Sequence, residues 1–490
     1  MTRDTTGQDH DVHPTGWTNP IPPRAYRLLV LGGGCAAVRA AIEAARLTGP
    51  VALVAARIDA EHGLDDATAA RLDFWQFVQS AAADLAQPPV GAASAALAVR
   101  FAEWTAQQRR SDRRAVQARR AQQLGDLGIE IHFGSAVFTG PDTIAVHGRE
   151  LKFERAIVAP GPAVPSDPIP AAVGADAGPL LTVDDWNRLE SLPKRLAVLG
   201  GGPGALELAD AFARLGSEVH LISAPGEFMS GEEPGAVDCL ARGLQRQGVR
   251  IHRDCALRDV EQLANARLVT IEHRHELRKL LADELLVLGQ QRQWTAPGGL
   301  AAARLTLRDA GLVVDDRLRT SNARIYAAGV CCATPRPLAD AEAYGRLAVR
   351  NALLSGGEHY SAVVAPRIVR ASPQLVQVGC TTLEARELGM ELDTYRCALP
   401  GHFEHFALIH TRHGTGRLLG ATLVAPDAAA LAPLLTLLVK EQLSLETLAE
   451  LTTGHLAGFE ALRSIAQQYA RRGSLAADRP SASTELAARV

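Results

Sequence analysis

The 490-residue chain lacks the marks of several large protein classes. It has no uninterrupted apolar stretch of the roughly 18 residues that a membrane helix requires. Its 51 Lys and Arg nearly balance its 54 Asp and Glu, so no global field attracts nucleic acid or an anionic membrane. We therefore expect partners among small molecules and proteins, with no nucleic acid and no membrane.

Cysteine is scarce, and its spacing forms no pairs. The seven cysteines are irregularly spread without a CxxC motif, which suits a reducing compartment better than a disulfide framework. Residues 1–25 are polar and Pro-rich, without the basic start and apolar run of a signal peptide. The sequence predicts a cytoplasmic protein of about three domains, with a disordered N-terminal arm over residues 1–25.

Two segments of the chain are similar to each other. One begins with the buried strand Tyr26–Leu31 and the other spans Arg195–Ile222; each continues as glycine turn, helix and second strand. This order is typical of the βαβ start of a doubly wound sheet. Residues 66–127 have the composition of long helices, and shorter strands followed by helices begin after about 360. The predicted fold is α/β, with two Rossmann-like dinucleotide-binding domains and a C-terminal α+β domain.

Each βαβ start carries a turn suited to a pyrophosphate. A GxGxxG or GxGxxA turn lets the backbone approach the phosphates and aims the N–H groups of the following helix at them. Glycine turns also serve tight packing, so binding and a structural remnant are both open. The residues that fit are Gly32, Gly34 and Ala37 in the first turn and Gly200, Gly202 and Ala205 in the second.

Neither turn is followed by the expected carboxylate. In dinucleotide sites an acid about 20 residues on accepts hydrogen bonds from the adenosine ribose. Here that position is Ala55 in the first unit and Ser223 in the second. The sequence around Ser223 contains no nearby Arg for a ribose 2′-phosphate, so the choice between NAD and NADP stays open.

These residues resemble the flavoprotein disulfide reductase family, which includes dihydrolipoamide dehydrogenase and glutathione reductase, and most closely its mercuric reductase branch. The resemblance covers about residues 26–472. It implies FAD at the first turn, with Gly161 and Gly329 beside it, and NAD or NADP at the second. The stretches that carry it are 32–37, 156–161, 196–218 and 320–329.

The resemblance also implies an order of domains and a homodimer formed by the last of them. The predicted segments are an arm over 1–25, an FAD-type domain over 26–180, an NAD(P)-type domain over 181–284, a return to the FAD-type domain over 285–358, a dimerisation domain over 359–472 and a flexible tail over 473–490.

The chain departs from the family where disulfide chemistry takes place. Members pass electrons to a CxxxxC pair, but the corresponding stretch is Ala60–Thr68, and no cysteine lies between Cys35 and Cys239. Thiolates are the nucleophiles of disulfide exchange, so their absence excludes dithiol chemistry there. Residues 473–490 also lack the cysteine pair that mercuric reductases use. We expect neither a dithiol reductase nor a mercuric reductase.

The implied FAD site is altered as well. The family's Gly-Gly-Thr falls on Ala60–His62, where Glu61 adds a negative charge beside phosphates, and the Asp of its "AAGD" motif is Val330. Each lost charge-assisted hydrogen bond is worth about 1.5 to 3 kcal/mol. The missing acids at Ala55 and Val330 therefore predict roughly 10²- to 10⁴-fold weaker FAD binding.

Some family partners are retained. Glu207 matches the carboxylate that pairs with a lysine near the nicotinamide; that lysine falls at Leu72, with Arg71 as a substitute. His455 and Glu460 match the spacing of the acid–base dyad that reaches the partner subunit's site. A carboxylate on the second ring nitrogen fixes the tautomer and raises the basicity of the imidazole. For this pair an interface contact is favoured over catalysis.

The remaining clusters have structural interpretations. Cys331 and Cys332 are expected to be buried small hydrophobes. The arginines from Arg109 to Arg120 are expected on the wet face of a helix, without the aromatic platform of a nucleic-acid groove. Four histidines near residue 407 do not share one strand face, which favours surface residues of a hairpin and no metal site. They are His402, His405, His410 and His413.

Two functions are open from the sequence. The first is an oxidoreductase that moves electrons from NAD(P)H through weakly held FAD to an acceptor other than a disulfide, with Glu207 shaping the nicotinamide pocket. The second is a flavin-free, non-catalytic homologue that acts as a dimeric binding or scaffold protein. Ancestry and both glycine turns favour the first; Ala55, Glu61, His62 and Val330 favour the second.

Overall fold

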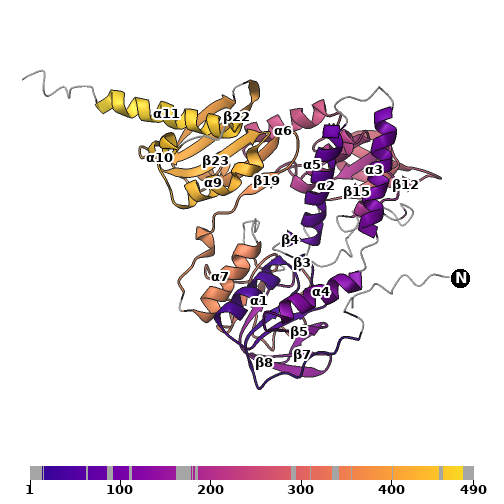
Figure 1. The fold of residues 1–490 in the computed structure, drawn as a ribbon, viewed down its shortest axis with the longest axis vertical. Coiled ribbons are helices and arrows are strands. Elements are labelled where there is room, and N and C mark those ends of the chain that lie inside the picture. Colours follow the sequence, from indigo (N-terminus) through magenta and orange to yellow (C-terminus); the bar gives the residue numbers. More distant parts are fainter. Residues whose placement is uncertain are drawn as a thin grey trace, which may run out of the picture.

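The computed structural model consists of two parallel-sheet domains and one antiparallel-sheet domain (Figure 1). In the described part of the chain, no helix is long and apolar enough to cross a membrane. The described residues are Pro14, 16–61, 64–84, 92–109, 113–161, 178, 180–182, 186–288, 294–309, 311–333, 341–354, 356–399, 401–451 and 456–477.

The first domain has a sheet of order β5-β2-β1-β8-β7-β6, in which β18 returns late in the chain to pair with β8. The core strands β5, β2, β1, β8 and β18 are parallel, so their carboxyl ends share one edge. Its strands are β1 (Tyr26–Leu31), β2 (Val51–Ala55), β5 (Ile129–Phe133), β6 (Ala136–Phe138), β7 (Thr143–Val146), β8 (Arg149–Val158) and β18 (Ile325–Ala327), with a small hairpin of β16 (Leu307–Arg308) and β17 (Gly311–Leu312).

Two helices of this domain pack closely because of small residues. The helix α1 (Cys35–Leu47) buries a row of alanines, and α7 (Ala341–Leu353) lies on it. A Cβ at Gly345 of α7 would stand 2.2 Å from the carbonyl oxygen of Ala36, so only glycine allows this approach. The contact brings α7 against the start of α1. The helix α4 (Arg113–Gly125) packs against β5.

Part of the predicted N-terminal arm contacts this domain. The side-chain amide of Asn19 donates to the carbonyl of Phe133 at 2.9 Å, and the Phe133 N–H donates to Asn19 Oδ1 at 3.0 Å. The Trp17 ring stands edge-on to the Phe133 ring, with centroids 5.3 Å apart. Asn19 thereby satisfies backbone groups at the free edge of the sheet, where β5 would otherwise expose them.

The second domain has a parallel sheet of order β11-β10-β9-β15. A three-stranded antiparallel sheet of β12, β13 and β14 lies between β11 and β15 in the chain. The two parallel domains confirm the predicted fold class. The elements are β9 (Arg195–Leu199), α5 (Pro203–Arg214), β10 (Glu218–Ile222), α6 (Pro234–Arg246), β11 (Arg250–His252), β12 (Ala256–Gln262), β13 (Arg267–His273), β14 (Glu276–Ala282) and β15 (Glu284–Val287).

Two helices from the first half of the chain cover the second domain. Figure 1 shows α2 (Asp66–Asp84) and α3 (Ala92–Arg109) beside α5. An aromatic cluster joins them, with ring centroids 4.9 to 6.4 Å apart. Such burial of large rings is a strong apolar contact. It fixes α2 against α5. The members are Phe74, Phe77, Phe101, Trp104, Trp186 in η2 (Trp186–Arg188) and Phe212.

The third domain is an antiparallel sheet of order β19-β20-β23-β22-β21 with helices against it, as predicted. The last helix extends to Ala477, so the first five residues of the predicted tail, 473–477, belong to it. The elements are η3 (Tyr360–Ala362), β19 (Arg367–Val369), β20 (Gln374–Gly379), α8 (Thr382–Glu387), β21 (Leu392–Leu399), β22 (His402–Arg412), β23 (Leu418–Ala425), α9 (Ala428–Lys440), α10 (Leu445–Glu450) and α11 (Ala457–Ala477).

One histidine predicted at the surface is buried. His410 on β22 is fully inaccessible; its Nδ1 lies 2.9 Å from the Thr394 hydroxyl and its Nε2 lies 3.6 Å from Glu233 Oε2. Burial alone would raise the pKa of Glu233, but contacts with His410 and hydrogen bonds from Thr382 lower it to about 2. The prediction was wrong for His410 because β22 packs against the second domain. His413 is exposed, as predicted.

One arginine predicted on a wet helix face is also buried. Arg120 of α4 is 7% exposed and donates to the Ile58 carbonyl at 2.8 Å. Gln117 accepts from the Ile58 N–H at 2.7 Å and donates to the same carbonyl. Both side chains hold the segment that follows β2. Arg114 and Arg119 are exposed, in agreement with the prediction.

The buried Asp210 of α5 provides a pH-dependent prediction. Its side chain is 1% exposed, and burial raises its pKa to about 6, against the opposing effects of Arg214 at 4.0 Å and the Ser372 hydroxyl at 3.2 Å. Because the folded pKa lies above the unfolded one, ionisation costs stability as the pH rises from about 4 through 6. We expect Asp210→Asn to raise the free energy of unfolding by about 1 to 3 kcal/mol at about pH 8 and little at about pH 4. Urea unfolding at both pH values measures this; an equal gain at both would contradict it.

Candidate dinucleotide-binding sites

Two glycines of the first turn are required by packing, and one leaves space. A Cβ at Gly32, where φ is +131°, would stand 1.9 Å from the Ala159 carbonyl oxygen, and one at Gly33 would stand 1.8 Å from the Arg57 carbonyl oxygen. Among the described residues, a Cβ at Gly34 would meet nothing nearer than the Cα of Gly161 at 3.8 Å. The first two glycines therefore hold the turn in place, and Gly34 faces open space.

The predicted residues of the first site converge around the start of α1. Gly34 is the N-cap residue of α1. Because glycine has no side chain, it does not accept a hydrogen bond from the first N–H groups of the helix. A Cβ on Gly329 would lie 3.8 Å from the Ala36 Cβ, and one on Gly161 would meet no atom of the described residues within 4 Å. Ala37 is buried beneath the turn. Such a cradle fits the anionic pyrophosphate of a dinucleotide.

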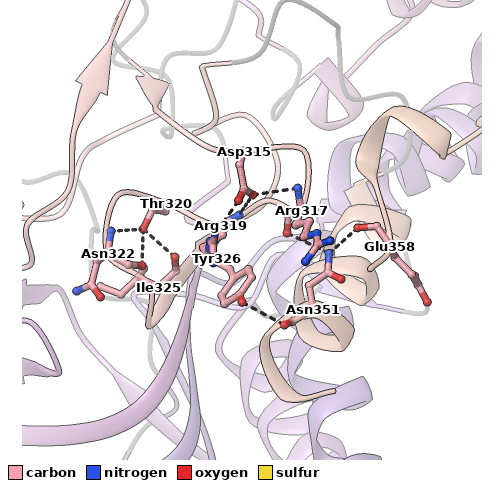
Figure 2. A network of polar contacts seen from close by, with 9 residues as sticks. All are labelled: Asp315, Arg317, Arg319, Thr320, Asn322, Ile325, Tyr326, Asn351 and Glu358. Atoms are coloured by element: carbon pink, nitrogen blue, oxygen red, sulfur yellow. Dashed lines mark hydrogen bonds and ion pairs between the residues drawn. The ribbon is translucent and has the colours of Figure 1, made fainter. Parts of the chain in front are cut away.

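A hydrogen-bond network holds the turn that precedes β18. Figure 2 shows Asp315 accepting from the N–H groups of Arg317 and Arg319, at 3.0 and 2.9 Å. The Thr320 hydroxyl donates to the Ile325 carbonyl at 2.7 Å, which closes the turn. The turn before β18 is thus closed by hydrogen bonds within residues 315–325.

A second part of this network ties β18 to α7. In Figure 2 the Tyr326 hydroxyl donates to the carbonyl of Asn351, and the Asn351 amide reaches back across the loop. The distances are 3.1 Å for Tyr326, 3.0 Å from Asn351 Nδ2 to the Arg317 carbonyl and 2.8 Å to the Glu358 carbonyl. Because α7 also rests on α1, these contacts place Gly329 beside the first turn.

The altered positions of the first site are at its rim. Ala55 ends β2 and is 4% exposed, whereas Val330 follows Gly329 and is 47% exposed. The strands β3 (Ala60–Glu61) and β4 (Leu64–Asp65) form a short hairpin where the family has Gly-Gly-Thr, and β3 contacts α1. His62 and the side chain of Glu61 lie outside the described residues.

The second turn repeats the design of the first. A Cβ at Gly200 would stand 1.4 Å from the Leu288 carbonyl oxygen, and one at Gly201 would stand 2.7 Å from the Glu227 carbonyl. A Cβ at Gly202 would meet nothing within 4 Å in the described part of the chain, and Gly202 caps α5 without a side chain. Ala205 is buried under the turn, 2% exposed. The second site therefore also has an open cradle at a helix N-terminus.

Glu207 lies where α2, α5 and the residue after β19 meet. Its Oε2 is 3.3 Å from Arg71 Nε, and its Oε1 accepts the N–H of Arg370 at 2.9 Å. Arg71 comes from α2, Glu207 from α5, and Arg370 follows β19. A Cβ on Gly204 would lie 3.5 Å from Arg71 Nη1. The structure thus pairs Glu207 with Arg71, the substitute that the sequence offered for the family's lysine.

Sequence reasoning missed Arg253. Ser223 N–H donates to the His252 carbonyl at 2.9 Å, and Cys255 N–H donates to the Ser223 carbonyl at 3.0 Å. Arg253 lies in the sequence between His252 and Cys255, the two residues that make these contacts. Its guanidinium lies over the Phe228 ring, 4.1 Å from the ring centroid. The signal was available only from sheet order, because β11 lies next to β10 while Arg253 is 30 residues from Ser223.

Other predicted residues that the structure describes include Glu460, Cys331 and Cys332. His455 lies outside the described residues, and Glu460 is half-buried in the first turn of α11. Cys331 is fully buried and donates to the Val158 carbonyl; the adjacent Cys332 thiol and burial raise the pKa of Cys331 well above its ordinary value. Cys332 is half-buried. Among the described residues, no group of three or more His, Cys, Asp and Glu could hold a metal ion.

Comparisons with known proteins agree with this geometry. The family model described as pyridine nucleotide-disulphide oxidoreductase matches residues 26–349. Mercuric reductase from Acidithiobacillus ferrooxidans is 32% identical over 363 residues, which cover 71% of this chain and 64% of that protein. A mercuric reductase from Staphylococcus aureus is 28% identical over 457 residues, covering 89% of this chain and 81% of that protein.

The fold is shared with a solved flavoprotein. The HOCl-induced flavoprotein disulfide reductase from Escherichia coli superposes with a TM-score of 0.71, over 90% of this chain and 99% of that one, at 23% identity. At that identity the likeness concerns the fold alone. The match to the Acidithiobacillus protein spans less than two thirds of its length.

Proposed function

The chain belongs to the pyridine nucleotide-disulphide oxidoreductase family, and from this premise we propose that it is an NAD(P)H-dependent flavin oxidoreductase whose acceptor is neither a disulfide nor mercuric ion. The observation that carries the proposal is the pair of open cradles. At both Gly34 and Gly202 a missing Cβ leaves space, within the described residues, in front of a helix whose N-cap has no side chain. The family resemblance assigns FAD to the first and a nicotinamide dinucleotide to the second.

The first cradle fits FAD on the chemistry of its donors. The N–H groups at the start of α1 attract a pyrophosphate, and Gly161 and Gly329 leave room beside it. FAD, when bound, would supply the two-electron carrier between the nicotinamide and the acceptor. The chain itself provides the binding and the exclusion of water. Because the acids at Ala55 and Val330 are missing, we expect weaker binding than in the family.

The Arg71–Glu207 pair is proposed to shape the nicotinamide pocket. Glu207 is 12% exposed and Arg71 is 22% exposed, so their attraction is little screened by solvent. Glu207 is also held by the N–H of Arg370. The carboxylate therefore orients the guanidinium on the α2 side of the second turn. Arg71 is a positioning residue in this account, and a transferred electron pair does not pass through it.

The acceptor is proposed to react without a thiol from this segment. The hairpin of β3 and β4 and the start of α2 contain no cysteine. Cys331 in the first domain is buried and its pKa is raised, so its thiolate is disfavoured.

If the third domain forms a homodimer, as in the family, His455 and Glu460 are proposed to hold a proton at the partner's site. A monomer in light scattering would remove that shared site.

The proposed function is tested by anaerobic titration of the purified, FAD-reconstituted protein with NADPH and with NADH. We expect one of the two to bleach the visible flavin band. Arg71→Met is expected to slow the bleaching about 10- to 10²-fold at unchanged FAD content, because it leaves Glu207 without its cation. The control is Arg46→Met on the exposed side of α1, which should bleach like the wild type.

Two results would contradict the proposal. Bound flavin that neither coenzyme bleaches would refute the oxidoreductase assignment. Rapid turnover with oxidised lipoamide or mercuric ion would refute the assignment of the acceptor. A third outcome has a narrower meaning. If the flavin of Arg71→Met is bleached at the wild-type rate, only the role assigned to Arg71 is refuted.

A further inference from the structure

A groove of about 400 Å³ opens at the carboxyl end of β11. One wall is α6, which contributes Asp238 and Arg242, and the opposite wall is the β13–β14 hairpin, which contributes Arg278. His252 and Arg253 at the end of β11 form its floor. The groove therefore lies beside the last residues of the edge strand of the second sheet.

The groove is positively charged at neutral pH. Three arginines and one aspartate supply the fixed charges. Burial, followed by the effects of His220 and nearby arginines, lowers the pKa of His252 to about 4, so this imidazole is neutral. His252 stacks on His220, with Nε2 and Nδ1 2.9 Å apart. The net positive charge of the groove favours an anionic ligand. Because His252 is neutral, the arginines are the groups that attract this anion.

Backbone contacts connect Arg253 to the second glycine turn. The loops after β10 and β11 are joined because Gly226 N–H donates to Asp254 Oδ1 at 3.2 Å. Phe228, under the Arg253 guanidinium, precedes Met229, whose N–H donates to the Gly201 carbonyl at 2.8 Å. Arg253 thus borders the edge of the site at which the ribose of the adenosine is recognised.

The residue at the ribose position carries no charge. An acid at the end of β10 would accept from both ribose hydroxyls and repel a 2′-phosphate. Ser223 stands there instead, fully buried, and its Oγ has no hydrogen-bond partner within the described part of the chain. Glu227, the carboxylate nearest in sequence, accepts from the N–H of Ala224 at 3.4 Å. Ser223 itself therefore supplies none of the repulsion that an acid at the end of β10 would exert on a 2′-phosphate.

Arg253 is held in a way that leaves it able to bind a phosphate. Its side chain is 36% exposed, rests on Phe228 and has Asp238 as its ion-pair partner, with Nη1 and Oδ1 3.6 Å apart. That distance is too long for a hydrogen bond, so the N–H groups of the fork can serve a further acceptor. Guanidinium groups bind phosphates with two parallel hydrogen bonds.

We infer that the second site selects the coenzyme with a ribose 2′-phosphate, and that Arg253 is the residue that binds this phosphate. The inference rests on the proposed function, because it takes the second turn to hold a nicotinamide dinucleotide. In this chain the residues directly after β10 include no arginine that could bind the 2′-phosphate. The inference gives this task to Arg253, which directly follows β11. Arg242 and Arg278 add to the field of the groove.

The test measures binding and needs no turnover. Isothermal titration compares 2′,5′-ADP with 5′-AMP, which differ by the 2′-phosphate alone. We expect the wild type to bind 2′,5′-ADP at least about tenfold more tightly, as one charge-assisted contact provides. Arg253→Ala should bring the ratio close to one without weakening 5′-AMP, and Arg253→Lys should give an intermediate ratio because it keeps the charge without the fork.

The matched control is Arg250→Ala, at the opposite end of the same strand, where Arg250 pairs with Glu218. It removes the same charge and should keep the ratio. Thermal unfolding of each variant shows whether it is folded. Wild-type protein that binds both nucleotides equally, yet is reduced by NADH, contradicts the inference and leaves the proposed function intact. Protein that binds neither nucleotide nor coenzyme contradicts both. Selectivity that survives in Arg253→Ala and Arg253→Lys refutes the assignment to Arg253.

Discussion

Gly34→Val is expected to give a folded protein that has lost FAD. The backbone at Gly34 has φ −81° and ψ −178°, an extended conformation open to valine. Valine as N-cap costs about 1 kcal/mol, which shifts the unfolding temperature by a few degrees. Its side chain would fill the space in front of α1 and displace at least two charge-assisted hydrogen bonds. We expect FAD affinity to fall about 10³-fold or more.

The matched control lies two residues earlier. Gly32→Ala adds one carbon where the Ala159 carbonyl oxygen is 1.9 Å away and φ is +131°, so it should disrupt the turn and the domain. Gly202→Val repeats the first change in the second site and should remove coenzyme binding while FAD is retained. Flavin content, coenzyme titration and thermal unfolding distinguish the three variants. A Gly34→Val protein that keeps its FAD would place the flavin elsewhere.

Val330→Asp is expected to tighten FAD binding about 10- to 10²-fold. The substitution restores the acid of the family motif directly after Gly329, and one charge-assisted hydrogen bond contributes about 1.5 to 3 kcal/mol. Val330 is 47% exposed, so an aspartate there pays little desolvation in the apoprotein. Ala55, at 4% exposure, would bury a new carboxylate and is the poorer position.

Val330→Asn is the control, because asparagine has the shape of aspartate without the charge. It should give a smaller gain than Val330→Asp. Fluorescence quenching of FAD on titration with apoprotein measures all three dissociation constants. Unchanged affinity in Val330→Asp would mean that the acid of the motif has no partner in this chain, and that the predicted weakening has another origin.

The glycine turns were predictable because they are local. A buried strand, a turn with three fixed small residues and an amphipathic helix are adjacent in sequence, so Gly34 and Gly202 follow from the pattern. The Arg71–Glu207 pair also followed from the family comparison, because the family's lysine falls at Leu72 in α2 and the adjacent Arg71 offers a substitute cation. The chemistry of the two glycine turns is set within a few residues of chain, whereas the Arg71–Glu207 pair joins two helices that are distant in sequence.

The remaining features depend on contacts between distant elements. Arg120 and His410 are buried because the segment after β2 and the second domain, respectively, cover them, which no local pattern records. Arg253 reaches the second site through the pairing of β11 with β10. Burial and strand order are tertiary properties that local sequence patterns do not record. The sequence therefore assigned Arg120 and His410 to the surface and gave no signal for Arg253.

The most direct measurement is the stoichiometry and dissociation constant of FAD with purified apoprotein, determined by equilibrium titration and by flavin released on denaturation. The structure predicts saturation at one FAD per chain with a dissociation constant of about micromolar, the value expected when a nanomolar site loses two acidic contacts. If folded protein, whatever its oligomeric state, shows no saturable binding at about millimolar FAD, the account is contradicted.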